Sequence, residues 1–70
     1  MTDKRAKAIG ARIKELRLKA GLSQLGLATK AGIQSNTVAR AERGLHRPSL
    51  ETLEKLAKAL SVTTTDITGV

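Results

Sequence analysis

The sequence contains no cysteine and no phenylalanine, tryptophan or tyrosine. Without cysteine, the chain can form neither a disulfide framework nor a thiolate metal site, and a single histidine, His46, cannot assemble a metal site alone. Zinc-dependent modules are therefore excluded. The missing aromatic side chains also exclude the stacking platform on which nonspecific single-strand binders hold nucleotide bases.

Acidic side chains are scarce as well. Thirteen Lys and Arg face six Asp and Glu, which gives a formal charge of +7 and an isoelectric point near 10.7. Such a balance attracts a polyanion, either nucleic acid or an acidic membrane. No apolar run reaches transmembrane length, and the start of the chain has no signal-peptide pattern. We therefore expect a cytoplasmic protein with no membrane association.

The 70 residues allow one domain, residues 1–70, with a small core. Since aromatic residues are absent, Leu, Ile, Val and Ala must form that core, which suits closely packed helices. Helical spacing of apolar residues predicts a first helix at about 4–20, on Ile9, Ile13, Leu16 and Ala20. Asp3 is its expected cap, and Gly21 its expected terminator.

Three further helices follow, with a possible fifth. Ser23 can cap a helix at about 24–31, and Gly32 supplies the positive φ of a tight turn. A helix at about 35–43 follows Gln34, which is a weak cap. Ser49 can cap a helix at about 50–60, and a short helix is possible at about 64–69. The fourth helix has the clearest apolar stripe, formed by Leu50, Leu53, Leu56, Ala57 and Leu60. The predicted fold class is all-α, a compact bundle of four to five short helices.

The segment from Gln24 to Arg43 has the spacing of a helix-turn-helix. Ala28 permits close packing of the two helices, Gly32 permits the sharp turn, and Val38 buries one side of the second helix. Short polar and basic side chains at the start of an exposed helix can meet base edges in a major groove. The residues expected to point outward are Ser35, Asn36, Thr37, Arg40 and Arg43.

The chain resembles the lambda repressor and Cro-like (Xre-type) helix-turn-helix DNA-binding domains. The stretches that carry the resemblance are IGARIKELRLKAGLSQ, LATKAGI, AERG and RPSLETLEKLAKAL, in that order. In that family the second helix of the motif lies in the major groove while the first crosses the backbone. The resemblance implies a sequence-specific regulator of transcription that binds double-stranded DNA, a repressor acting as a homodimer at least on DNA. The sequence shows no Ser, His and Asp constellation, phosphate loop or paired-carboxylate site, so we expect no enzymatic activity. We also expect no cofactor, metal or small-molecule ligand.

The resemblance also implies residue roles. Ser35, Asn36 and Arg40 match base-reading positions. Phosphate contact is implied for Gln24, Arg43 and Arg47, and Gln34 and Thr37 match less defined contact positions. Arg17 and Glu42 match a partly buried ion pair that fastens the first helix to the third. Ile67 and Val70 are the apolar residues available for a dimer contact.

Several positions depart from the family pattern. Leu25 and Gly26 stand where acidic or polar residues are usual, and Leu18 and Leu45 also replace polar residues. These leucines could form an apolar patch for a partner protein. The alternative hypothesis is therefore an antitoxin-like or coactivator-like interaction module that regulates transcription only with a partner. A membrane-binding amphipathic helix fits poorly, because the apolar stripes are divided among several helices.

Overall fold

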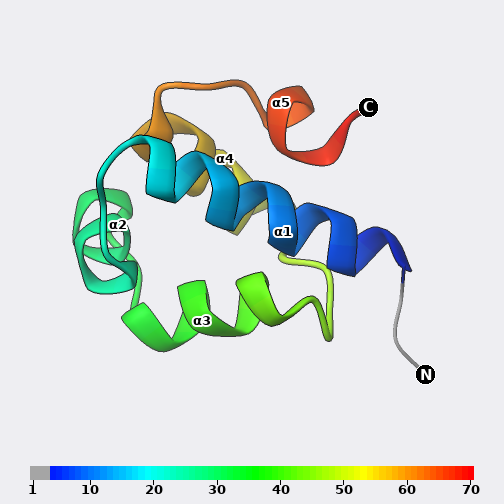
Figure 1. Cartoon of the computed structure of the whole chain (residues 1–70), viewed down its shortest axis with the longest axis horizontal. Helices are drawn as coiled ribbons and strands as arrows, with labels where there is room; N and C mark the ends of the chain where they lie inside the picture. The colour runs from blue at the N-terminus through cyan, green and yellow to red at the C-terminus, as the bar shows by residue number, and fades with distance from the viewer. Residues whose placement is uncertain (1–3) are drawn as a thin grey trace.

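The computed structural model describes residues 4–70 and consists of helices and connecting turns within that range (Figure 1). The helices are α1 (Lys4–Lys19), α2 (Gln24–Ala31), α3 (Ser35–Arg43), α4 (Leu50–Leu60) and α5 (Thr64–Thr68). The predicted all-α class is therefore confirmed, and the possible fifth helix is present. Asp3, the expected cap of α1, lies outside the described residues. No described helix is long and apolar enough to cross a membrane.

Local sequence explains where the helices begin and end. The side chains of Ser23 and Ser49 accept hydrogen bonds from backbone N–H groups in the first turns of α2 and α4. Gln34 precedes α3 without a side-chain cap bond, as expected of glutamine. Thr63 and Asp66 form a reciprocal capping box at α5. At the end of α4, Ser61 adopts the left-handed conformation with φ 59°, where glycine is the usual residue.

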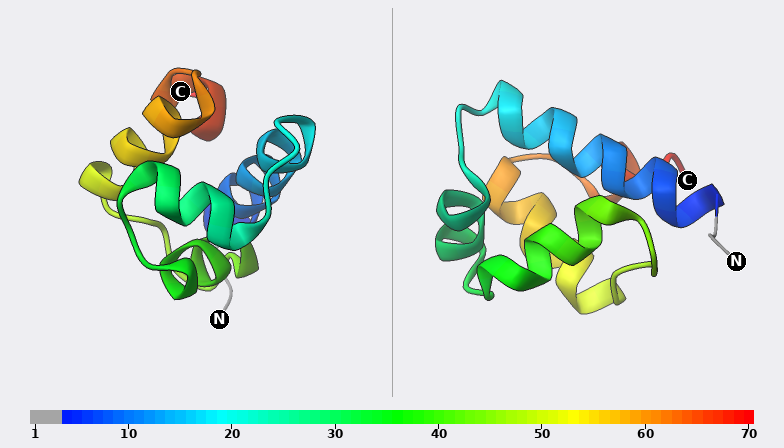
Figure 2. Two further views of the ribbon diagram at one scale, coloured as in Figure 1. Left: turned by 90° about the vertical axis from the view of Figure 1, so that its left-hand side faces the viewer. Right: turned by 60° about the horizontal axis from the view of Figure 1, so that its bottom comes forward.

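The core lies at the centre of the bundle, where all five helices contribute side chains. Ile13, Leu27, Val38 and Leu56 are its largest fully buried side chains. α2 runs into α3 through the turn after Ala31, and both helices pack against each other (Figure 2). α1 packs along α3 and also contacts α5, whereas α2 and α5 each pack against α4. The helix-turn-helix is thus held from two sides by α1 and α4.

Two glycines allow α1 and α3 to approach closely. A Cβ atom on Gly10 would lie 2.5 Å from the carbonyl oxygen of Ala41, and one on Gly44 would lie 2.6 Å from Cα of Lys7. Gly44 also has a φ of 73°, in the left-handed region that favours glycine. The backbones of the two helices therefore meet with no space for a side chain between them.

The structure corrects three sequence-based expectations, and the end of α5 differs from the expected one by a single residue. α1 ends at Lys19, and Ala20 is exposed beyond it. Leu50 is not part of the buried stripe of α4, because it is the first helical residue and is 67% exposed. α5 ends at Thr68. Ile67 is buried between α5 and the rest of the core, so it is not available for contact with a second copy.

Candidate nucleic-acid interface

Helix α3 has one buried side and one exposed side. Val38 and Ala41 point into the core, where Val38 is fully buried. Ser35, Asn36 and Arg40 are exposed, as is Arg43 in the last turn. α3 therefore presents two short polar side chains near its N-terminus and two arginines further along.

An ion pair fixes α3 to α1. The Nε of Arg17 lies 2.6 Å from Oε2 of Glu42, and its Nη2 donates to Oε1 of Glu42 at 3.1 Å. Both side chains are buried, with 9% of Arg17 and 5% of Glu42 exposed. Arg17 also donates through Nη1 to the backbone carbonyl of Leu22 at 2.9 Å. The hydrogen bond with Glu42 raises the pKa of Arg17, so the guanidinium stays charged.

The same carboxylate accepts a hydrogen bond from α2. The Nε2 of Gln24 donates to Oε1 of Glu42 at 3.2 Å. Glu42 therefore connects α1, α2 and α3. An amide NH₂ group has two donors, so Gln24 retains one N–H and its carbonyl oxygen for another partner. The family resemblance paired Arg17 with Glu42, and this pair is confirmed. It did not indicate that Gln24 donates to the same carboxylate, and helical spacing gives no sign of contacts between separate helices.

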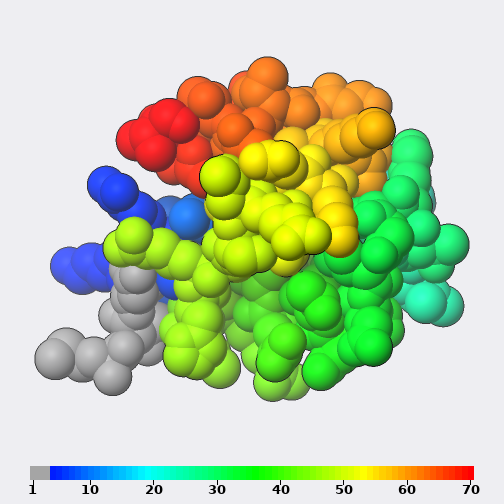
Figure 3. Space-filling model, turned by 180° about the vertical axis from the view of Figure 1, so that it is seen from behind, coloured from blue at the N-terminus to red at the C-terminus, as the bar shows by residue number. Residues whose placement is uncertain are grey.

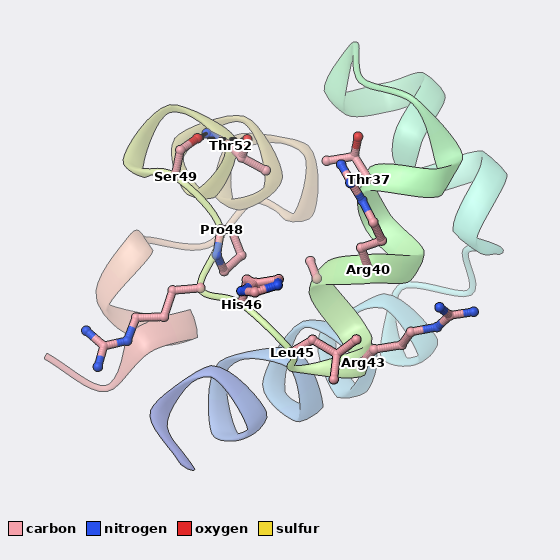
Figure 4. Close-up of a pocket in the computed structure, with 10 residues that line it drawn as sticks. Thr37, Arg40, Arg43, Leu45, His46, Pro48, Ser49 and Thr52 are labelled. Carbon is pink, nitrogen blue, oxygen red and sulfur yellow. Dashed lines mark hydrogen bonds between the residues drawn. The ribbon is translucent and has the colours of Figure 1, made fainter. Parts of the chain in front are cut away.

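A groove of about 440 Å³ separates α3 from the loop between α3 and α4. Figure 4 shows Thr37 and Arg40 of α3 on one side and Ser49 and Thr52 on the other, with His46 and Pro48 in the loop. Arg43 and Arg47 also line it. The groove therefore collects three arginines beside α3, a concentration of positive charge that suits a phosphate backbone.

The predicted contact residues divide into three groups in the structure. Thr37, Arg40, Arg43 and Arg47 line the groove. Gln34, Ser35 and Asn36 are exposed at the start of α3 and are not among its lining residues. Gln24 is half-buried at the start of α2, beside Glu42. Sequence reasoning missed His46 as a groove residue, because nothing in its neighbours indicates how the loop folds back.

The three leucines of the predicted apolar patch are exposed. Leu18, Leu25 and Leu45 are 58%, 65% and 53% exposed. Leu45 lines the arginine groove, whereas Leu18 and Leu25 do not. The three leucines therefore do not line one common groove.

A helix-turn-helix family matches residues 13–67 of the chain, a span that includes α2, α3 and α4. The chain belongs to this family. An immunity repressor protein of Bacillus phage phi105 is 41% identical over 61 residues, which cover 87% of this chain and 42% of the repressor. The chain thus spans less than half the length of that relative.

Two crystal structures extend the similarity to three dimensions. The restriction-modification controller protein C.AhdI from Aeromonas hydrophila is 37% identical, with a TM-score of 0.84 over 89% of this chain and 94% of that protein. SinR, a master regulator of biofilm formation solved in complex with DNA, is 40% identical. Its TM-score is 0.76 over 80% of this chain and 90% of that one. The named relatives are regulators and repressors, in agreement with the prediction that the chain is not an enzyme.

Proposed function

We propose that this chain is the DNA-binding domain of a transcriptional repressor that reads duplex DNA with α3. The observation that carries the proposal is the division of α3 into a buried side anchored through Glu42 and an exposed side bearing Asn36 and Arg40. Anchoring matters because side chains must be held in register to read base edges. The similarity to SinR, solved with DNA, supports the same partner.

We assign base contacts to Ser35, Asn36 and Arg40. Asparagine can bind adenine through two hydrogen bonds, and arginine can bind guanine in the same way. Their exposure near the start and middle of α3 supports this role. The assignment predicts that changing these residues alters which sequence is preferred.

We assign phosphate contacts to Gln24, Arg43 and Arg47, with Gln34 and Thr37 as further contacts. Arg43 and Arg47 line the groove beside α3, and Gln24 has a free donor at the N-terminus of α2. Phosphate contacts fix the position of a protein on DNA but carry no sequence information. These residues should therefore contribute equally to binding of all sequences.

We also propose that the chain is a homodimer at least when bound to DNA, with two copies on one operator. We propose in addition that the protein acts in the cytoplasm. One recognition helix covers few base pairs, so a two-fold site doubles the sequence that is read. Half-sites would repeat about 34–36 Å apart along the duplex. Val70, 77% exposed at the end of the chain, is the apolar residue available near α5 for the contact.

The decisive experiment selects binding sites for the purified chain from a random duplex library, with no partner protein added. We expect a two-fold symmetric consensus and a complex of two chains by analytical ultracentrifugation. No enrichment over input would reject sequence-specific binding and favour the partner-dependent interaction module, which the exposed Leu18 and Leu25 support. Saturation of the full site by one chain would reject the dimer but not sequence-specific binding.

A further inference from the structure

A second groove lies where the C-terminal end of α2 meets α4. It has a volume of about 500 Å³ and is lined by residues that include Lys30, Ala31, Gly32, Lys55, Lys58 and Ala59. Figure 3 shows the face on which α4, in yellow to orange, adjoins the green segment that contains the end of α2. None of its lining residues belongs to the groove beside α3. It is therefore a separate surface feature.

Charge in this second groove is of one sign. Three lysines and no carboxylate line it. Within residues 4–70, Lys30 and Lys58 have no ion-pair partner. Lys55 lies 3.3 Å from Glu51, but that pair is exposed, and exposed pairs contribute little. The rim thus offers positive charge that the chain itself does not neutralise.

The floor of the groove is small and apolar. Ala59 is 5% exposed and Ala31 is half-buried. A Cβ atom on Gly32 would meet no atom within 4 Å, so the space above the turn is open. The groove therefore combines a small apolar floor with a cationic rim.

We propose that this groove binds an acidic protein segment in which carboxylates flank apolar side chains. Carboxylates would meet the lysines, and an apolar side chain would cover the alanines. A DNA backbone also complements the rim, but its phosphates gain no favourable contact with the apolar floor. The proposal concerns a protein partner and does not depend on the proposed DNA binding.

A second copy of this chain is a poor occupant of the groove. Each copy carries a formal net charge of +7, so two copies repel each other. The favoured occupant is therefore a different, acidic protein.

The test is an NMR titration of the isotope-labelled chain with a short synthetic peptide in which glutamates flank leucines. Backbone amide shifts should concentrate at residues 29–32 and 55–59. The double variant Lys30→Glu, Lys58→Glu should bind the peptide about tenfold more weakly, because two attractive contacts become repulsive. The matched control is Lys14→Glu, Lys19→Glu, which changes two exposed lysines of α1 and the net charge equally. We expect less than about a twofold loss for this control.

Several results would overturn the proposal. Equal losses in the two double variants would show attraction by net charge alone. Equally tight binding of a peptide with glutamine in place of glutamate would show that charge complementarity does not contribute to binding. Amide shifts on α3 would place the peptide on the proposed DNA surface. If the groove variant weakens duplex DNA binding more than the α1 control does, the lysines belong to the nucleic-acid interface.

Discussion

The junction of α1 with α3 and the junction of α1 with α5 hold their helices in different ways. At α3, a buried ion pair and two glycines bring residues distant in the sequence into direct contact. At α5, the capping box is local, Ile67 supplies the buried side chain, and Arg12 donates through Nε to the carbonyl of Asp66 at 2.9 Å. The helix proposed to read DNA is therefore fixed by a buried ion pair and a close approach of backbones, whereas α5 is held by a local capping box, one buried apolar side chain and an exposed hydrogen bond.

The largest expected loss of stability comes from Gly10→Ala, at the junction of α1 with α3. The added Cβ would meet backbone carbonyls of Ala41 and Glu42, which cannot move aside without shifting α3. We expect a loss of about 3 kcal/mol or more in unfolding free energy, which is the upper range for overpacking. Chemical denaturation measures it.

The control is the same substitution at another helical glycine, Gly26→Ala in α2. Its Cβ would meet Oγ of Ser23 at 3.2 Å, and alanine raises helix propensity by about 1 kcal/mol. We expect a change within about 1 kcal/mol in either direction. Equal destabilisation by both variants would show that the close approach of α1 and α3 is not the cause.

The next effect comes from Glu42→Ala, which leaves Arg17 buried without its partner. Loss of one member of a fully buried pair costs about 3–5 kcal/mol, and we expect a cost near the lower end because both side chains retain some exposure. For a domain of this size, each kcal/mol lowers the melting temperature by about 4–8 °C. The exposed Glu54→Ala in α4 should stay within about 0.5 kcal/mol. If the Glu42→Ala variant and the parent protein have the same melting temperature, the ion pair does not contribute to stability.

Substitutions on the outer side of α3 sharpen the comparison, because they should affect DNA binding and leave stability unchanged. Asn36→Ala and Arg40→Ala should each cost about 1–3 kcal/mol against the preferred site and relax the preference at one position per half-site. Affinity for scrambled duplexes should change less, particularly for Asn36→Ala. If neither variant changes the ratio of its affinities for preferred and scrambled duplexes, α3 is not the helix that reads the sequence.

Arg43→Ala and Arg47→Ala should instead weaken binding to preferred and scrambled duplexes alike. Each should lower the slope of log affinity against log salt by about one unit per subunit. Gln24→Ala should weaken both without changing the slope, since glutamine is neutral. Salt titrations on both duplexes measure these differences, and a sequence-dependent loss for either arginine would reassign it to a base contact.

The smallest effect is expected at α5. Hydrogen bonding of the Asp66 carboxylate to the backbone N–H of Thr63 lowers the pKa of Asp66, with a further contribution from the Thr63 side chain. A lowered pKa stabilises the fold above the unfolded-state value of about 3.9, and this contribution is lost as pH falls through the lower folded-state value. Asp66→Asn should therefore melt slightly below the parent at pH 7, and the difference should shrink below pH 4. A difference independent of pH would contradict this.

Sequence reasoning predicted α2, α3 and α4 closely because their limits depend on local residues. Ser23 and Ser49 cap the helices that follow them, and Gly32 and Gly44 end α2 and α3. The Thr63 and Asp66 capping box is also local, and its spacing of three residues could have revealed α5.

The remaining features depend on packing between helices. Gly10 shows no sequence signal for its contact with Ala41, since a glycine inside a helical pattern indicates only lower propensity. The sequence favours Ile67 for a dimer contact, as one of the apolar residues of the tail, yet α5 packs against the core and buries it. The exposed residues of α3 were predictable from helical spacing, whereas the groove beside them depends on the path of the loop.

The hydrogen bond from Gln24 to Glu42 has a consequence for the entropy of binding. Ordering a flexible side chain at an interface costs about 0.5–1.5 kcal/mol, and a side chain that is already held avoids part of this cost. Gln24 is held before any ligand arrives, whereas Arg40 and Arg43 are exposed on α3. The phosphate contact proposed for Gln24 would therefore be made by a preorganised group that sets one docking angle. The arginines, with freedom to rotate, could adapt to the duplex at that angle.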